Sequence, residues 1–144
     1  MPRWLRVALG QAPVSPDVAL LVLRVCFGLT MALQHGLGKF SRIESFGAKI
    51  TGWGVPLGQL WALCAALSET VGALLIAVGL LARPAAGALL FTMSVAAFVA
   101  HGGDPFKKKE LALAFWAVSL AVVIAGPGRY SVDAWLLGRS RPKR

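Results

Sequence analysis

The sequence has few charged residues and very few acidic ones. Only 15% of its 144 residues are charged, and just six of them are Asp or Glu. A soluble globular domain carries about a quarter charged residues, so this composition argues against a water-soluble fold. Hydrophobic residues make up 57% of the chain, and they form long runs for which a bilayer is the better solvent.

Cysteine is equally scarce. The two cysteines, Cys26 and Cys64, form no CxxC pair and no spacing typical of a metal or c-type haem site. We therefore predict no metal site. Both cysteines lie in apolar runs, where we interpret them as small hydrophobic side chains. The alternative is a redox pair or disulfide between neighbouring helices, which requires Cα atoms within about 7 Å of each other.

Negative charge is outweighed by Lys and Arg, which give a formal net charge of +9. A nucleic-acid protein would need a basic face on a soluble fold. Here the basic residues lie between and beyond the apolar runs, where they contact lipid headgroups. We expect membrane lipids as partners and no nucleic acid. The first residues lack the features of a cleavable signal peptide, and their Trp, Leu and Arg residues predict a segment on the membrane surface.

Four apolar segments predict an all-α fold: an integral membrane four-helix bundle with short loops, in one membrane domain over residues 1–144. At about 1.5 Å per residue, each segment can cross a hydrocarbon core of roughly 30 Å. Pro and Gly residues mark the segment ends. The expected helices cover residues 17–38, 57–81, 84–101 and 105–125, with short interfacial segments at 1–12 and 129–138.

The number of crossings and the basic residues together predict an orientation. An even number of crossings places both termini on one side of the membrane. Lys and Arg are slightly more numerous on that side, so the positive-inside rule places both termini in the cytoplasm. In the last interfacial segment, Ser131 or Asp133 is expected to cap a short surface helix.

Two charged residues lie at membrane depth, Arg24 and Glu69. A charge there costs about 2.5 kcal/mol or more on insertion scales and normally faces the bundle interior. Glu69 shares its helix face with alanines and glycines, which let membrane helices approach closely. Counted from the helix ends, Arg24 and Glu69 differ in depth by only about one helical turn, and consecutive helices are usually neighbours. We therefore predict an Arg24–Glu69 ion pair. Such a pair is either a clamp that fixes the packing of the helices or a polar site for a ligand headgroup or a proton. In a third interpretation, the Arg24 side chain extends to the lipid headgroups.

A second polar group is expected at the other ends of the segments. His35 and His101 end parallel helices at one depth, and Glu110 shares a helix face with three alanines. The histidines could hydrogen-bond a quinone carbonyl, relay a proton, ligate a haem, or merely end the helices in contact with water. Of the ligands, a quinone is favoured over haem. The remaining members of the group are Gln34, Lys39 and Asp104.

An ordered set of motifs runs through residues 18–137. It comprises Leu21-Val-Leu-Arg24 with His35-Gly36-Leu-Gly-Lys39-Phe40, then Glu69-Thr-Val-Gly72 with Arg83-Pro84, and finally Glu110 with Gly126-Pro-Gly128-Arg129-Tyr-Ser131-Val-Asp133. This set resembles the DoxX family of small bacterial membrane proteins. The resemblance implies a four-helix fold in the bacterial inner membrane and a link to quinol oxidation, thiosulfate:quinone oxidoreduction and thiol-oxidative stress. The recurrent polar positions that it matches are Arg24, His35, Lys39, Glu69, Glu110 and Asp133.

Two classes of function follow. The first is an accessory subunit of a membrane redox system that binds a quinone or another lipophilic ligand; if it is an enzyme, it is a quinone-linked oxidoreductase subunit. His35 or His101 would then hold a carbonyl, and Glu69 or Glu110 would handle the proton. The second is a non-enzymatic scaffold or small-molecule carrier with an Arg–Glu clamp. Because no nucleophile, metal site or nucleotide loop appears, a binding or accessory role is favoured. The expected partners are redox-complex subunits or a second copy of the chain.

Overall fold

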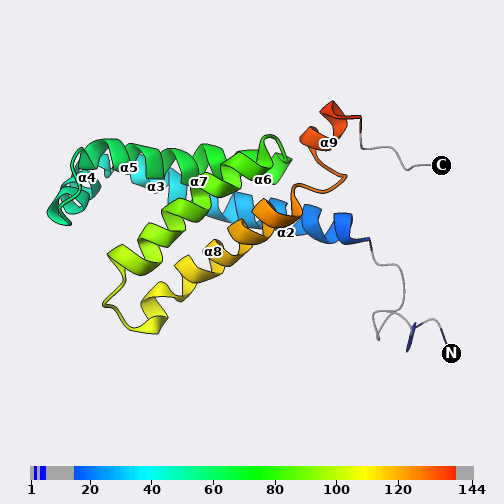
Figure 1. Ribbon diagram of the computed structural model, residues 1–144, viewed down its shortest axis with the longest axis horizontal. Helices are drawn as coiled ribbons and strands as arrows, with labels where there is room; N and C mark the ends of the chain where they lie inside the picture. The colour runs from blue at the N-terminus through cyan, green and yellow to red at the C-terminus, as the bar shows by residue number, and fades with distance from the viewer. Residues whose placement is uncertain (1, 3, 6–14, 139–144) are drawn as a thin grey trace.

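The computed structural model describes residues 2, 4, 5 and 15–138, and this part of the chain is helical, without β-strands. Long helices run side by side, with one short helix folded back at one end and another at the opposite end (Figure 1). The elements are α2 (Pro16–Thr30), η1 (Met31–Gly36), α3 (Leu37–Phe40), α4 (Ile43–Gly52), α5 (Gly58–Leu67), η2 (Ser68–Gly72), α6 (Ala73–Val78), α7 (Ala82–Ser94), η3 (Val95–Ala100), α8 (Phe106–Ala125) and α9 (Val132–Leu136).

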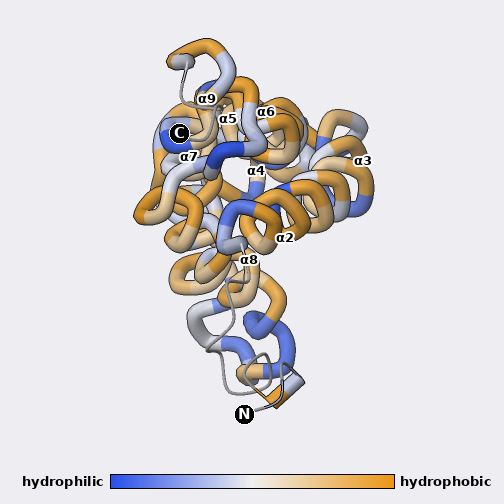
Figure 2. The backbone as a smooth tube through the Cα atoms, turned by 90° about the vertical axis from the view of Figure 1, so that its right-hand side faces the viewer, coloured by the Kyte–Doolittle hydropathy of each residue, from blue (hydrophilic) through white to orange (hydrophobic). Residues whose placement is uncertain are grey.

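Among the described residues, three continuous helices have the length and composition to cross a membrane. They are Pro16–Phe40, Gly58–Val78 and Ala82–Ala100. Each boundary lies within three residues of its predicted position. Helix α8 has 20 residues, but its first turns carry three lysines and Glu110. Figure 2 shows hydrophobic residues along the helices and hydrophilic ones gathered at the helix ends.

Small residues bring α2 against α6. A methyl group on Gly28 would overlap the carbonyl oxygen of Ala73 and lie 2.8 Å from the Cβ of Ala77. The helices therefore pack through their backbones, as expected for membrane helices with small residues at the contact. The predicted small-residue face around Glu69 is thus a packing face. The equivalent prediction for α8 is wrong: Glu110 and the alanines that share its face are exposed, and the buried residues of that helix are Ser119 and Val122.

The three long helices each contain a π-helical stretch: η1, η2 and η3. A π-helical segment inserts an extra residue into the helical repeat and so turns the following side chains to a different face. Glu69 lies within η2, while Lys39 and His101 follow η1 and η3. All three polar residues therefore owe their direction to a local departure from α-helical geometry, and such departures are frequent at functional sites.

Helix α4 was not predicted from the sequence, which indicated a loop between the first two long helices. It packs on the start of α5 through two glycines. A Cβ on Gly47 would lie 2.7 Å from the Cα of Gln59, and one on Gly58 would overlap the carbonyl oxygen of Gly47. This close approach folds α4 back beside α5 and makes it one side of the cavity described below.

Residues 126–137, here called the C-terminal hook, turn back onto the bundle after α8 (Figure 1). Gly126 ends α8 with φ +76°, a conformation that favours glycine. Ser131 accepts a hydrogen bond from Ala134 N, which confirms the predicted capping of a short helix. Asp133 instead caps α7, since its carboxylate accepts from the backbone N–H groups of Leu81 and Ala82 at 2.8 and 3.0 Å. Most of the predicted interfacial segment 1–12 lies outside the described residues.

Candidate functional site

The centre of the candidate site is an ion pair between Lys39 and Glu69. The Lys39 ammonium donates a hydrogen bond to Oε1 of Glu69. The Glu69 side chain is 1% exposed, whereas that of Lys39 is 30% exposed. A buried carboxylate without a partner would be costly, and Lys39 supplies that partner. The Lys39 ammonium also lies 5.1 Å from the centre of the Phe46 ring.

Arg24 does not pair with Glu69, and that prediction is wrong. The Arg24 guanidinium donates from Nη1 to the carbonyl oxygens of Ile76 and Ala77 at 3.0 and 3.3 Å. From Nη2 it donates to the carbonyl oxygen of Tyr130 at 2.7 Å. Arg24 is fully buried, so it faces protein, as predicted. Its role here is to bind the C-terminal hook to the end of α6.

The register of the two helices explains why the predicted pair does not form. Glu69 is level with Gly36, since a Cβ on Gly36 would lie 2.6 Å from the Glu69 carbonyl oxygen. Gly36 follows Arg24 by twelve residues, or about 18 Å along the helix. Counting residues from the helix ends had placed Arg24 and Glu69 at similar depths. Lys39, one turn beyond Gly36, points back toward Glu69, as long side chains on helices do.

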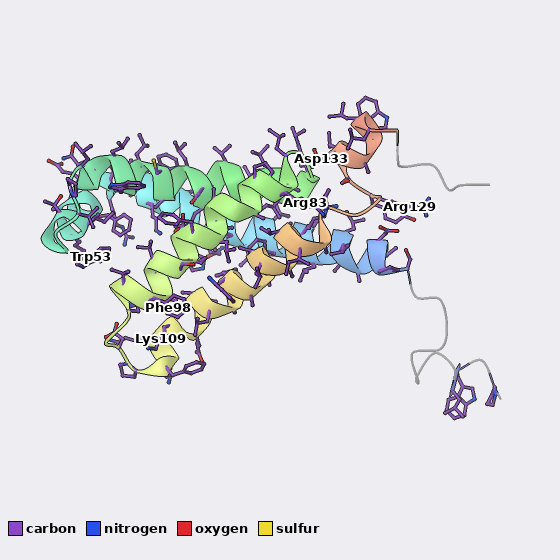
Figure 3. All side chains as sticks on the ribbon, in the orientation of Figure 1. Trp53, Arg83, Phe98, Lys109, Arg129 and Asp133 are labelled. Atoms are coloured by element: carbon purple, nitrogen blue, oxygen red, sulfur yellow. The ribbon has the colours of Figure 1, made fainter. Side chains whose placement is uncertain are left out.

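An apolar cavity of about 510 Å³, here called the lateral pocket, lies beside the ion pair. It is lined from α3, α4, α5, η2, α7 and η3, and its aromatic walls are Phe46, Trp53, Trp61 and Phe91. Trp61 and Phe91 lie with ring centres 6.4 Å apart. Trp53, which lines the pocket at the end of α4, is labelled in Figure 3. Several lining side chains are exposed on the outer surface, so the pocket opens sideways, where acyl chains surround a membrane protein.

Few polar groups accompany Lys39 and Glu69 in the lateral pocket. Ser68 and Thr92 share a hydrogen bond of 2.8 Å between their hydroxyl oxygens. His101 lines the pocket and its Nδ1 lies 2.8 Å from Oδ2 of Asp104. This hydrogen bond is the main reason why the pKa of Asp104 lies below its ordinary value. The pocket therefore combines apolar walls with a charged pair on one side and a histidine fixed by a carboxylate on another.

The remaining predicted site residues lie elsewhere. His35 packs edge-on against Phe115 of α8, with ring centres 5.4 Å apart, and it does not line the lateral pocket. The two histidines, which were predicted to end parallel helices at one depth, therefore do not share this pocket. Glu110 is exposed and also stands apart from it. The sequence predictions missed the aromatic walls. Phe46 and Trp53 come from α4 and its end, which were not recognised, and no local pattern singled out Trp61 and Phe91 on α5 and α7.

Both cysteines are exposed and free, so the alternative of a disulfide between neighbouring helices is wrong. Cys64 lines the lateral pocket, whereas Cys26 does not. Within residues 15–138 no cluster of three or more His, Cys, Asp and Glu side chains is arranged to hold a metal ion.

The comparisons with known proteins gave one match. A family model described as DoxX matches residues 19–102, more than half of the chain. The matched range contains Arg24, the Lys39–Glu69 pair and every residue that lines the lateral pocket. The searches of curated proteins and of solved structures returned no match.

Proposed function

The chain belongs to the DoxX family, and from this premise we propose that it binds a lipophilic, quinone-like molecule in the lateral pocket, as an accessory subunit of a membrane redox system. The observation that supports this proposal is the buried Lys39–Glu69 ion pair on the wall of an aromatic pocket. A volume of about 510 Å³ suits a small ring compound with part of its tail, since ligand pockets measure about 300–1,000 Å³.

The proposal includes a multi-pass topology in the bacterial inner membrane. Helix α8 is its fourth crossing, because 20 residues reach about 30 Å. The lysines of its first turns would lie among headgroups, where Lys side chains extend to the interface. The excess of Lys and Arg beside the termini then places both termini in the cytoplasm.

Within the lateral pocket each polar group has a distinct part. Lys39 would donate a hydrogen bond to a ligand carbonyl, while Glu69 holds the ammonium in position. His101 would contact the other polar edge of the ligand, with its ring orientation fixed by Asp104. A bound quinone supplies two-electron, two-proton redox chemistry, and Glu69 and His101 are the residues placed to exchange the protons. The aromatic rings would exclude water from the ligand ring.

A carrier without redox activity is the second candidate, and one observation favours it. Of the two cysteines only Cys64 lines the lateral pocket. The pocket therefore has no dithiol for the thiol-linked redox chemistry that the family resemblance implies. A carrier would use the same apolar walls and polar groups to bind and release its ligand. The two candidates therefore share the binding site and differ in turnover alone.

Binding is tested with the full-length protein in nanodiscs and decylubiquinone as the probe, followed by quenching of tryptophan fluorescence. Ala96 lines the pocket, so Ala96→Phe fills it and should weaken binding by about tenfold or more. The matched control is Ala114→Phe, on an exposed face of α8, which should bind as the wild type does. Lys39→Met and Glu69→Gln should also weaken binding.

Two outcomes would reject parts of the proposal. Equal affinity of wild type and Ala96→Phe would remove the lateral pocket as the binding site. The rate of decylubiquinol oxidation in native membranes distinguishes the two candidates. For a redox subunit, this rate should fall in Ala96→Phe but not in Ala114→Phe. For a carrier, the rate should be the same in both variants and in the wild type.

A further inference from the structure

A second cavity, of about 410 Å³, lies where the C-terminal hook meets the bundle. It is here called the hook cavity. Its lining comes from the start of α2, the α6–α7 turn, the end of α8 and the hook itself. These are helix ends, and in a membrane protein helix ends lie at the level of the lipid headgroups. The hook cavity is thus separated from the lateral pocket, with which it shares no lining residue.

Two arginines line the hook cavity, Arg83 and Arg129. Arg83 donates from Nη2 to the carbonyl oxygen of Ile124 at 3.2 Å. Within residues 15–138 neither guanidinium lies within ion-pair distance of a carboxylate. Both arginines are exposed and are labelled in Figure 3 beside Asp133. They therefore offer donors that a ligand can use.

The carboxylates of the hook cavity are already engaged by the backbone. Both oxygens of Asp133 accept hydrogen bonds from the N–H groups that open α7, and its charge attracts the buried Arg24. Asp17 Oδ1 accepts a hydrogen bond from the backbone N–H of Arg129 at 2.8 Å. Consequently the negative charge of Asp133 is balanced by Arg24. The two positive charges of Arg83 and Arg129 exceed the single negative charge of Asp17.

The backbone of the hook shapes the cavity around these arginines. Gly126 and Gly128 have φ of +76° and +75°, a region that favours glycine. A Cβ on Gly126 would lie 3.3 Å from both Nε and Nη2 of Arg83, and one on Gly128 would lie 3.3 Å from Oδ1 of Asp17. Larger residues at these two positions would crowd the charged groups. The turn thus keeps the Arg83 guanidinium accessible.

From this arrangement we propose that the hook cavity binds a phosphate oxyanion through Arg83 and Arg129. Arginine forms paired, charge-assisted hydrogen bonds with phosphate oxygens, and basic pockets between helix ends bind anionic headgroups. The phosphate is either that of an anionic phospholipid or a free ion, and the apolar residues Leu81, Pro84 and Leu137 on the same lining are suited to the first carbons of a lipid.

The test measures lipid binding by native mass spectrometry of the full-length protein, released from detergent with phosphatidylglycerol or phosphatidylcholine added. Wild type should retain phosphatidylglycerol preferentially. Each of Arg83→Gln and Arg129→Gln should reduce that preference by about fivefold, the effect of one arginine near an anionic surface. The matched control is Arg42→Gln, an exposed arginine at the other end of the bundle, which should retain the preference.

A second arm distinguishes the two sources of phosphate. Inorganic phosphate, at millimolar concentration, is added to the lipid-free protein and thermal unfolding is recorded. A rise in Tm that Arg129→Gln abolishes supports a free ion, whereas no rise together with the lipid preference supports a headgroup.

Arg129 provides the variant least subject to misfolding, because its structural contact is made by its backbone N–H, which glutamine keeps. A folded Arg129→Gln protein with the lipid preference of wild type, and no response to inorganic phosphate in wild type, would overturn the proposal. Equal losses in Arg42→Gln and Arg129→Gln would overturn it as well, since binding would then depend on overall charge.

Discussion

Gly28 lies against Ala77 so closely that a methyl group on Gly28 would come within 2.8 Å of the Ala77 Cβ. This contact sets the distance between α2 and α6. We predict that Gly28→Ala lowers the free energy of unfolding by about 1–3 kcal/mol, because the added carbon has no room. Unfolding in mixed micelles measures the change.

The control for this prediction is Gly87→Ala, on α7, where a Cβ would meet nothing within 4 Å. Alanine there should be neutral or stabilising by up to about 1 kcal/mol, because it restricts the unfolded chain more than glycine does. Similar losses at both positions would mean that helix approach at Gly28 is not what limits stability.

Because Lys39 and Glu69 form an ion pair, we predict that the changes in unfolding free energy of their single variants do not add up in the double variant. Lys39→Met leaves the buried Glu69 carboxylate without a partner and should destabilise the protein by about 3 kcal/mol. Adding Glu69→Leu should recover most of that loss, since no buried charge remains. Free energies of unfolding of the single and double variants give the coupling. For comparison, Arg24→Met with Glu69→Leu should be additive, because these residues share no contact.

We predict that Arg24 stabilises the C-terminal hook. Its side chain donates hydrogen bonds to carbonyl oxygens at the end of α6 and at Tyr130. Each hydrogen bond from a charged donor contributes about 1.5–3 kcal/mol, so Arg24→Met should release the hook. Hydrogen exchange of residues 126–137 should become faster, while α4 exchanges as before. Unchanged protection of the hook would show that its contacts through Asp133 and Asp17 hold it without Arg24.

The lowered pKa of Asp104 predicts that the stability of the turn before α8 depends on pH. This pKa lies below the ordinary value, mainly because of the hydrogen bond with His101. Burial acts in the opposite direction and raises the pKa, while Lys108 lowers it further. A carboxylate with a lowered pKa in the folded state stabilises that state fully above its ordinary pKa. This contribution is lost as the pH falls below about 4.

Carboxyl chemical shifts from NMR titration measure the pKa of Asp104 directly. In His101→Ala the pKa should rise toward its ordinary value, since the main cause of the shift is removed. In Lys108→Gln the rise should be smaller. An Asp104 pKa that is the same in wild type and His101→Ala would contradict the hydrogen bond as the cause.

The long helices could be predicted from the sequence because their signals are local. Apolar length and the Pro and Gly residues at their ends determine them within three residues. The inward direction of Arg24 and Glu69 was also predictable, since lipid does not tolerate either charge. Helix α4 was missed because its ten residues mix polar and apolar side chains, and because it depends on two glycine contacts with α5.

The partners of the buried charges could not be predicted, for a physical reason. Helix register depends on which small residues meet across the contact, as Gly28 meets Ala73 and Gly36 meets Glu69. Three π-helical stretches then change the side-chain directions. A count along ideal helices contains neither effect, so it paired Glu69 with Arg24 in place of Lys39. The capping of α7 by Asp133 is a contact over 51 residues, and no local pattern signals it.

The hydrogen bond between Arg24 and Tyr130 joins residues 106 positions apart, and this spacing affects biogenesis. A growing chain inserts α2 into the bilayer long before the ribosome has made Tyr130. Until then the guanidinium lacks one of its carbonyl acceptors, and the α7 N-terminus lacks the Asp133 carboxylate. Nascent chains that end before the hook should therefore remain open to quality-control proteases, because these two contacts have not yet formed.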